Sequence, residues 1–234
     1  MIEETNFETF LYISKHKYNI SVLNKKRLEN LYSKDQNFNI ELSSNNLEDL
    51  TRFLDDNIFK IEKLVGYFIK NITLIIENDK NFNVDIGLKK KINEKLIHKK
   101  NLEINLIEIK NLFKENYQNQ TIMHMLINSY IINGIRHSSY VTEKNYDHLC
   151  IETKFISIPN AIIDSLDELL EKYQIKVSQY MCGNYINNFF TENTTELSSM
   201  AYKLKNGLND NEVILIPKNM ENKGFFEKFF QLFS

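Results

Sequence analysis

The sequence is poor in the residues on which several classes of protein depend. It has two cysteines, two prolines and six glycines among 234 residues. Cys150 and Cys182 are too few for a disulfide framework and form no CxxC pair, so a reducing compartment is the simplest interpretation. Neither a G-x-G-x-x-G stretch nor a Walker phosphate motif occurs. The sequence therefore does not indicate nucleotide chemistry of the kinds that depend on those motifs.

Strong charge and long apolar runs are also missing. The formal net charge is -2, so the chain lacks the basic field that nucleic-acid-binding proteins use. No apolar run approaches the roughly 20 residues that a helix needs to span a bilayer. The first ten residues, MIEETNFETF, are acidic and do not resemble a signal peptide. These absences predict a protein of the cytosol, or one bound peripherally to the cytosolic face of a membrane, with no nucleic-acid partner.

What is present is a mixture of strand and helix patterns. Helical spacing of apolar residues predicts helices over 45–70, 106–117, 159–173, 185–190 and 195–207. Runs with strand spacing predict strands over 7–14, 18–23, 27–33, 72–78, 81–92, 121–133, 148–158 and 175–182. In the first helix the predicted apolar stripe is Leu47, Leu50, Phe53, Leu54, Ile58, Ile61, Leu64, Val65 and Phe68. The mixture favours an α/β or α+β body.

The last eleven residues, GFFEKFFQLFS, separate completely into an aromatic and a polar side when placed on a helix. Such a helix is too short to cross a bilayer but suits its interface. We predict a membrane-binding segment with the residues Lys223, Phe225, Phe226, Lys228, Phe229, Phe230, Leu232 and Phe233. Two alternatives remain open: a terminal helix docked on the protein's own core, and a helix seated in a partner's groove.

Other reactive side chains show no pattern of a site. The histidines do not form an HxxxH or HExxH arrangement. Cys150 on its alternating strand is interpreted as a small buried hydrophobe. The basic run from Lys89 to Lys100 favours a solvated loop, with a membrane or an acidic partner as the alternative. We therefore expect no catalytic residue, no metal and no cofactor. An enzyme with an unrecognised pocket remains a third possibility.

Two stretches carry a resemblance to a known family. Residues 122–135 read IMHMLINSYIINGI, with His124, Tyr130, Gly134 and Ile135 in a strand-and-turn pattern. Residues 154–181 read KFISIPNAIIDSLDELLEKYQIKVSQYM, which follows a strand–helix–strand order without a gap. Both stretches resemble the bacterial cell-division protein FtsA, an actin homologue, in the subdomain called 1C. The aromatic C-terminal segment after a polar linker is similar to another feature of that family.

The resemblance implies an α/β fold with a single actin-like lobe, subdomain 1A, and an inserted FtsA-type 1C (SHS2-like) α+β subdomain. The expected boundaries are 1–82 for the first part of 1A and 83–178 for 1C. Residues 179–207 would return to 1A, and 208–234 would form the linker and the amphipathic membrane helix. The second lobe of the family would be absent.

The chain departs from the family where that family binds nucleotide. The expected phosphate loop between the first two strands reads YISKHKYNI, with neither Asp nor Gly. Glycine lets backbone N–H groups approach phosphate, and Asp organises the metal, so nucleotide binding is not expected here. The second phosphate loop should follow the stretch YMCGNYINNFF, but TENTT stands there instead.

The resemblance therefore implies a non-enzymatic cell-division adaptor on the cytoplasmic face of the bacterial inner membrane, at the division site. Its expected partners are the anionic lipid surface and divisome proteins, with FtsZ among the candidates and self-association through 1C as a further expectation. The alternative is an actin-like cytoplasmic adaptor of a pilus or secretion assembly machine.

Overall fold

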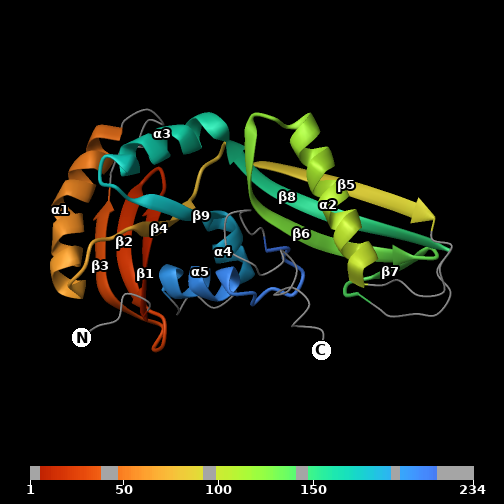
Figure 1. Cartoon of the computed structure of the whole chain (residues 1–234), viewed down its shortest axis with the longest axis horizontal. Coiled ribbons are helices and arrows are strands. Elements are labelled where there is room, and N and C mark those ends of the chain that lie inside the picture. The colour runs from red at the N-terminus through yellow and green to blue at the C-terminus, as the bar shows by residue number, and fades with distance from the viewer. Residues whose placement is uncertain (1–5, 38–46, 92–98, 141–146, 191–195, 215–234) are drawn as a thin grey trace. The chain divides into compact units, whose positions relative to one another are not determined.

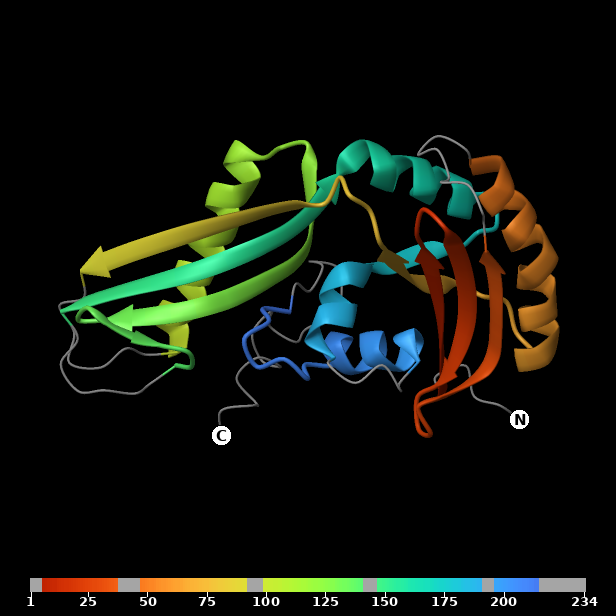
Figure 2. The same ribbon diagram turned by 180° about the vertical axis from the view of Figure 1, so that it is seen from behind.

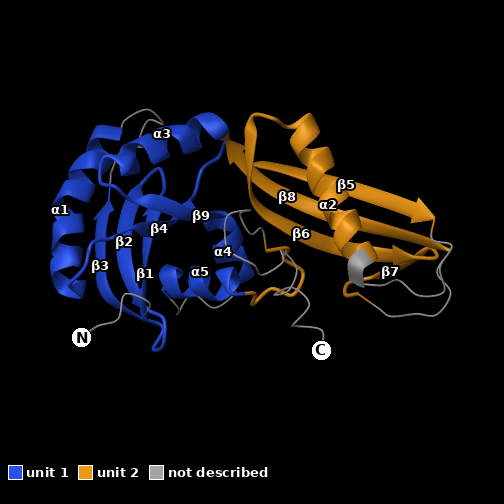
Figure 3. Ribbon diagram, viewed as in Figure 1, with its two compact units in different colours: residues 1–81, 160–206 blue, residues 82–159, 207–234 orange. Residues whose placement is uncertain are grey.

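The structure, a computed structural model, describes residues 6–37, 47–91, 99–140, 147–190 and 196–214. The chain divides into two compact units, shown in different colours in Figure 3. Unit 1 contains residues up to Asn81 and residues Asn160–Asn206. Unit 2 contains Phe82–Pro159 and, from Gly207 onward, the described residues up to 214. Each unit has its own sheet and its own core.

Unit 1 is built on a five-stranded sheet with the order β3-β2-β1-β4-β9. The antiparallel pairs β1–β2 and β2–β3 come first along the chain, and β4 then adds in parallel to β1 and β9 in parallel to β4. The apolar run of β4 is buried at five successive residues, which is typical of a strand covered on both faces. The strands are β1 (Phe7–Ile13), β2 (Lys17–Asn24), β3 (Glu29–Asn37), β4 (Asn71–Ile76) and β9 (Lys176–Cys182).

Helices cover both faces of this sheet. On one face of β2, the ring of Tyr18 lies 5.8 Å from the ring of Phe53 in α1. On the opposite face, Leu23 packs with Met200 and Leu204 of α5. Figures 1 and 2 show α1 and α5 on opposite sides of the sheet. The helices of unit 1 are α1 (Leu47–Val65), α3 (Asn160–Glu171), α4 (Gly183–Phe189) and α5 (Leu197–Lys205).

Helix α1 confirms most of the predicted apolar stripe but ends earlier than predicted. The buried members are Leu50, Phe53, Leu54, Ile58, Ile61 and Val65. The helix stops at Val65 because Gly66 follows with φ of 83°, a left-handed conformation that commonly closes a helix. Leu64 and Phe68 are 50% and 77% exposed, so these two members of the apolar stripe do not lie on the buried face. Phe68 lies beyond the helix, where the helical spacing no longer applies.

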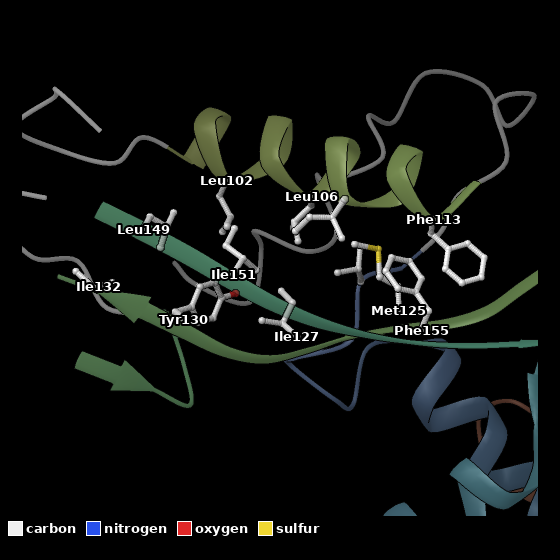
Figure 4. Close-up of a cluster of buried hydrophobic side chains, with 12 residues drawn as sticks. Leu102, Leu106, Phe113, Met125, Ile127, Tyr130, Ile132, Leu149, Ile151 and Phe155 are labelled. Atoms are coloured by element: carbon white, nitrogen blue, oxygen red, sulfur yellow. The ribbon is translucent and has the colours of Figure 1, made fainter. Parts of the chain in front are cut away.

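Unit 2 is a four-stranded antiparallel sheet, in the order β5-β8-β6-β7, with one helix packed against it. Leu102, Leu106 and Phe113 of the helix meet apolar side chains of β6 and β8 (Figure 4). The rings of Phe113 and Phe155 stack with centroids 4.6 Å apart. The elements are β5 (Phe82–Lys91), α2 (Lys99–Asn116), β6 (Gln120–Ile132), β7 (Ile135–His137) and β8 (His148–Pro159).

The short strand β7 was not predicted from the sequence. It forms a hairpin with β6 through Asn133 and Gly134, whose φ values are 49° and 89°. Asn-Gly with positive φ at both residues is a favoured two-residue hairpin turn. The turn signal was present in the sequence, but a strand of three residues is too short to produce a hydrophobic pattern of its own.

The borders of the two units differ from the expected subdomain borders. Residues 160–178 were assigned to the inserted subdomain, whereas α3 and β9 lie in unit 1. The reason is pairing, because β9 bonds in parallel to β4 and so completes the unit 1 sheet on that side. Pro159 is the last residue of β8 rather than the first of a helix, and α3 begins at Asn160.

The start of the expected polar linker is also integrated into a unit. Its residues 211–213 run antiparallel to β6, with Ile127 N–H donating to the Asn211 carbonyl at 2.8 Å and Val213 N–H donating to the Met125 carbonyl at 2.8 Å. Val213 is 2% exposed and belongs to the core cluster of unit 2. Residues 211–213 of the linker expected from residue 208 therefore pair with β6 and belong to unit 2.

Candidate functional site

The turn between β1 and β2 occupies the place of the expected phosphate loop. Ser14 N–H donates to the Lys17 carbonyl at 2.9 Å, and the Ser14 hydroxyl donates to the same carbonyl at 3.1 Å. His16 N–H donates in turn to the Ser14 hydroxyl at 3.4 Å. The turn thus uses the N–H groups of Ser14 and His16 for its own closure, whereas a phosphate loop presents such groups to its ligand.

Both lysines of this turn contact carboxylates of the chain. Lys17 forms an ion pair with Asp35 of β3 at 2.9 Å, and Lys15 forms one with Asp79, which follows β4. These side chains are partly exposed, so each pair contributes little to stability. Their positive charge is nevertheless balanced locally, which weakens the turn as an anion site.

The carboxyl ends of β1, β4 and β9 lie side by side, and open α/β sheets usually bind ligands at that edge. Here the edge contains an aromatic ring and a carboxylate: the Tyr12 hydroxyl donates to Glu77 Oε2 at 2.7 Å. Burial and this hydrogen bond raise the pKa of Tyr12 to about 12, so its proton stays on the hydroxyl at neutral pH. A carboxylate at this position repels phosphate.

Gly183, the first residue of α4, lies against the same pair. A Cβ atom at this position would stand 3.2 Å from Glu77 Cβ and 3.2 Å from Tyr12 Cε2, which is tighter than ordinary contact. Any larger residue would have to displace these neighbours by a few tenths of an ångström, so glycine suits the close packing between the strand ends. In other proteins a glycine at such an edge lets the backbone approach a ligand. Here Gly183 lets the backbone approach Tyr12 and Glu77 of the same chain.

The two cysteines show no sign of activation. Burial raises the pKa of the Cys182 thiol, and Asn81 Nδ2 donates to its sulfur at 3.3 Å. Burial and then the charge of Glu152 raise the pKa of the Cys150 thiol. Because the thiolate is the reactive form, both residues are thiols of low nucleophilicity at neutral pH.

Among the described residues, no group of three or more His, Cys, Asp or Glu side chains could hold a metal ion. His98 lies outside the described residues, and so do residues 92–98 of the basic run from Lys89 to Lys100. In the described part of that run, Lys90 forms an ion pair with Glu108 of α2, and Lys89 and Lys91 are exposed on β5. The basic residues described at 89–91 are thus part of a strand and not of a loop.

His124, one of the residues behind the family resemblance, has a structural contact that sequence reasoning missed. Its Nδ1 lies 2.6 Å from Glu212 Oε1, and the two residues are 1% and 8% exposed. This buried contact joins β6 to the chain after Gly207, across 88 positions of sequence. No local pattern could have revealed it, because neither residue stands near the other in the chain.

The face of the unit 2 sheet away from α2 is polar. Arg136 binds the carboxylate of Glu152 through both of its terminal nitrogens, at 2.5 and 3.0 Å, and Ser129 donates to the same carboxylate at 2.8 Å. These hydrogen bonds hold the pKa of Glu152 below its usual range. Nearby, Asn128 Nδ2 donates to Asp85 of β5 at 3.0 Å. Figure 2 shows the three long strands of this sheet from the side away from α2.

The predicted membrane-binding residues, Lys223, Phe225, Phe226, Lys228, Phe229, Phe230, Leu232 and Phe233, lie outside the described residues. The alternatives for that segment therefore stay open. Within the described part of the chain, no helix combines the length and the apolar character that crossing a membrane requires.

Comparison with known proteins gives structural likenesses only. No protein-family model matches the chain, and no curated protein matches it. Among solved structures, the chain is similar to a chain of the "PilM-PilN type IV pilus biogenesis complex", with a TM-score of 0.51 and 7% identity over 78% of this chain and 49% of that chain.

Two further solved structures have lower scores. A Bacteroides thetaiotaomicron protein described as having an actin-like ATPase fold and unknown function gives a TM-score of 0.32 and 18% identity, over 81% of this chain and 58% of that one. The other structure is the cytoplasmic domain of EpsL, an inner membrane component of the type II secretion system of Vibrio cholerae. It gives a TM-score of 0.36 and 8% identity, over 77% of this chain and 57% of that one. The chain thus spans about half of the solved chains it matches.

At such low identity a likeness shows the fold alone. The chain shares its mixed α/β arrangement of sheets and helices with the chain of the PilM–PilN complex, and this arrangement fits the actin-like fold of the sequence-based prediction. The likenesses do not support FtsA specifically, and they do not identify unit 2 as the 1C subdomain.

Proposed function

We propose that the chain is an actin-like cytoplasmic adaptor of a membrane-associated pilus or secretion assembly machine. The observation that carries the proposal is the superposition of 78% of the chain on a chain of the PilM–PilN type IV pilus biogenesis complex at a TM-score of 0.51. In this proposal the partner is a protein of the same machine in the inner membrane. The adaptor stays peripheral on the cytoplasmic face.

The edge of the unit 1 sheet supports an adaptor without nucleotide chemistry. The β1–β2 turn is closed by its own hydrogen bonds, and Glu77 adds a negative charge beside the strand ends. A site that binds ATP needs free N–H groups and positive charge or a metal at that place. The proposed protein therefore works by binding and not by hydrolysis.

A second candidate is the division adaptor suggested by the local resemblance to FtsA. One observation favours it: β8, α3 and β9 follow one another directly, as in the family's strand–helix–strand stretch. In this candidate, residues 83–178, which include α3 and the start of β9 of unit 1, correspond to subdomain 1C. The residues from Lys223 to Phe233 bind anionic lipid, and divisome proteins such as FtsZ are the partners. Self-association through 1C belongs to this candidate as well.

Cross-linking in the native cells separates the two candidates. The full chain carries an affinity tag, is cross-linked in vivo and is purified from membranes, and the attached peptides are identified by mass spectrometry. We expect cross-links to inner-membrane proteins of a pilus or secretion machine. Reproducible cross-links to FtsZ or other division proteins would replace the first candidate by the second. Cross-links to neither group would reject both.

The membrane segment has a separate test. Phe229→Glu with Phe230→Glu places two charges on the aromatic side, whereas Gln231→Glu adds one on the polar side and serves as the control. With vesicles containing anionic lipid, we expect the wild type and the control to sediment with the vesicles and the double variant to stay in solution. Equal sedimentation of all three proteins would count against lipid binding by this segment.

Nucleotide binding is tested by thermal unfolding with and without Mg²⁺–ATP, beside an actin-like ATPase as a positive control. The proposal expects the melting temperature of this chain to stay unchanged, because a ligand stabilises a protein only if it binds the folded state. A reproducible increase would show that the edge of the unit 1 sheet binds nucleotide after all.

A further inference from the structure

Strand β5 is a long strand at the edge of the unit 2 sheet. Its ten residues pair with β8 on one side, and no described strand pairs with its other side. Its side chains alternate: Val84, Ile86 and Leu88 pack toward the core cluster under α2, and Asp85, Gly87 and Lys89 are exposed. An edge of this length presents unpaired backbone groups to solvent, and proteins usually protect such an edge or use it.

The charged residues of β5 can form attractive pairs with a second copy of the same strand. If a second copy of β5 lies antiparallel with Gly87 opposite Gly87, position 85 of each copy faces position 89 of the other. Asp85, whose Oδ1 also accepts from Asn128 Nδ2 of the same copy, then faces Lys89 twice, once on each side of the two-fold axis. On the other face Ile86 meets Leu88 twice, so the apolar faces of the two sheets become continuous.

Packing within the chain does not explain the glycine at position 87, whereas a position at the centre of this arrangement does. A Cβ atom there would meet only Cys150 Sγ, at 3.9 Å, which is an ordinary contact, so internal packing does not demand glycine. Glycine within a strand weakens it and often marks the close approach of another backbone. In the proposed pairing, the two Gly87 residues stand opposite each other at the axis.

The lysines at the end of β5 favour pairing with some strands and oppose pairing with others. Edge lysines discourage pairing with strands that offer them no acidic or polar partner. Lys90 already contacts Glu108 of α2. In the register centred on Gly87, Lys89 meets Asp85 and Lys91 meets the amide of Asn83, whereas a shift by one residue moves Lys89 away from Asp85. The same residues thus favour one register and oppose others.

We propose that β5 is a homodimerisation edge, at which two copies of the chain pair antiparallel about Gly87 to form one continuous sheet. The inference does not depend on the proposed adaptor function, because it uses only the sequence and surroundings of β5. The partner is a second copy of this chain, because Asp85 of one antiparallel β5 strand faces Lys89 of the other.

Charge reversal tests the register in the full-length protein by sedimentation velocity over a range of concentrations. Asp85→Lys alone places two lysines opposite each other at both contacts, and Lys89→Glu alone does the same with two acids. We expect each single variant to weaken dimerisation about tenfold, because two attractive pairs become repulsive. Lys91→Glu has the same net charge as Lys89→Glu but faces Asn83, so it serves as the control and should change dimerisation little.

The decisive measurement mixes the two single variants. In a heterodimer of Asp85→Lys with Lys89→Glu, the introduced lysine of one copy meets the introduced glutamate of the other. At the second contact the unchanged Lys89 of the first copy meets the unchanged Asp85 of the second, so both contacts are attractive again. We expect the mixture to dimerise about tenfold more tightly than either variant alone, and the double variant Asp85→Lys, Lys89→Glu to dimerise as the wild type does. Circular dichroism and melting temperatures of all variants check that each is folded.

Three results would overturn the proposal. The first is a wild type that remains monomeric at all concentrations. The second is a mixture or a double variant that stays as dissociated as the single variants although all are folded. The third is association that is the same in every β5 variant, which would assign it to another part of the chain such as the aromatic C-terminal segment.

Discussion

The two sheets of this protein differ in how many of their faces are covered by helices. The unit 1 sheet has helices on both faces, and its strand β4 is buried at five successive residues. The unit 2 sheet has one described helix on one face, and its edge strand β5 alternates between half-buried and exposed side chains. Both sheets have an edge strand, β3 in unit 1 and β5 in unit 2, but among the described residues only the unit 2 sheet has a polar face that no helix covers.

The largest expected effect is on the one-sided core of unit 2. Phe155→Ala removes the ring that stacks on Phe113 at 4.6 Å and leaves a cavity under α2. We expect a loss of about 3–5 kcal/mol in the free energy of unfolding, measured by urea denaturation. Phe59→Ala is the control, because Phe59 is 70% exposed and its removal should change stability little. A small effect at Phe155 would mean that the helix does not seal this face.

A smaller effect is expected where the chain after Gly207 joins unit 2. Glu212→Ala deprives buried His124 of this partner, and we expect a loss of about 1–3 kcal/mol together with faster amide exchange at Ile127 and Val213. Asp210→Ala is the matched control, because Asp210 is an exposed carboxylate in the same segment. Equal exchange in both variants would show that the pair does not hold the segment.

The two-sided unit 1 offers a prediction on pH. The pKa of Tyr12 is raised to about 12 in the folded protein from 10.0, the value for an unperturbed tyrosine. Folding therefore favours the protonated form, and this contribution is complete below pH 10 and lost as the pH rises toward 12. Between these limits we expect Tyr12→Phe to lose stability less steeply than the wild type, in unfolding curves recorded at several pH values. Parallel curves would contradict the raised pKa.

The smallest expected effect concerns the β6–β7 turn at the end of unit 2. Gly134 has φ of 89°, so Gly134→Ala should destabilise the protein by about 1 kcal/mol, measured by thermal unfolding. Gly134→Asn should cost less, because asparagine tolerates a left-handed conformation better than alanine does. If the two variants were equally stable, the turn would have another geometry in solution.

Most of the elements could be predicted from the sequence because their patterns are local. The alternating strands β5 and β8, the continuous apolar run of β4 and the stripe of α1 each follow from the spacing of apolar residues. The predictions were wrong where one residue changes the geometry. Gly66 ends α1 before Phe68, and Asn133 with Gly134 turns the chain into β7.

The candidate site was predictable only in part. The missing Asp and Gly between β1 and β2 were visible in the sequence and indicated that this turn is not a phosphate loop. The contact of Tyr12 with Glu77 spans 65 positions, and its fit against Gly183 depends on the strand order β1-β4-β9. Such contacts depend on how strands line up, which local spacing does not encode.

By itself the sequence determined the type and order of the elements, because hydrophobic spacing and turn residues act over a few positions. It also determined the charge pattern of β5, since Asp85, Gly87 and Lys89 share one side of a single strand. Only the tertiary structure decided that β9 pairs with β4, and that residues 211–213 pair with β6 and place Glu212 beside His124. The physical reason is that backbone pairing and buried polar contacts join segments distant in sequence, and their free energy exists only once both segments are in place.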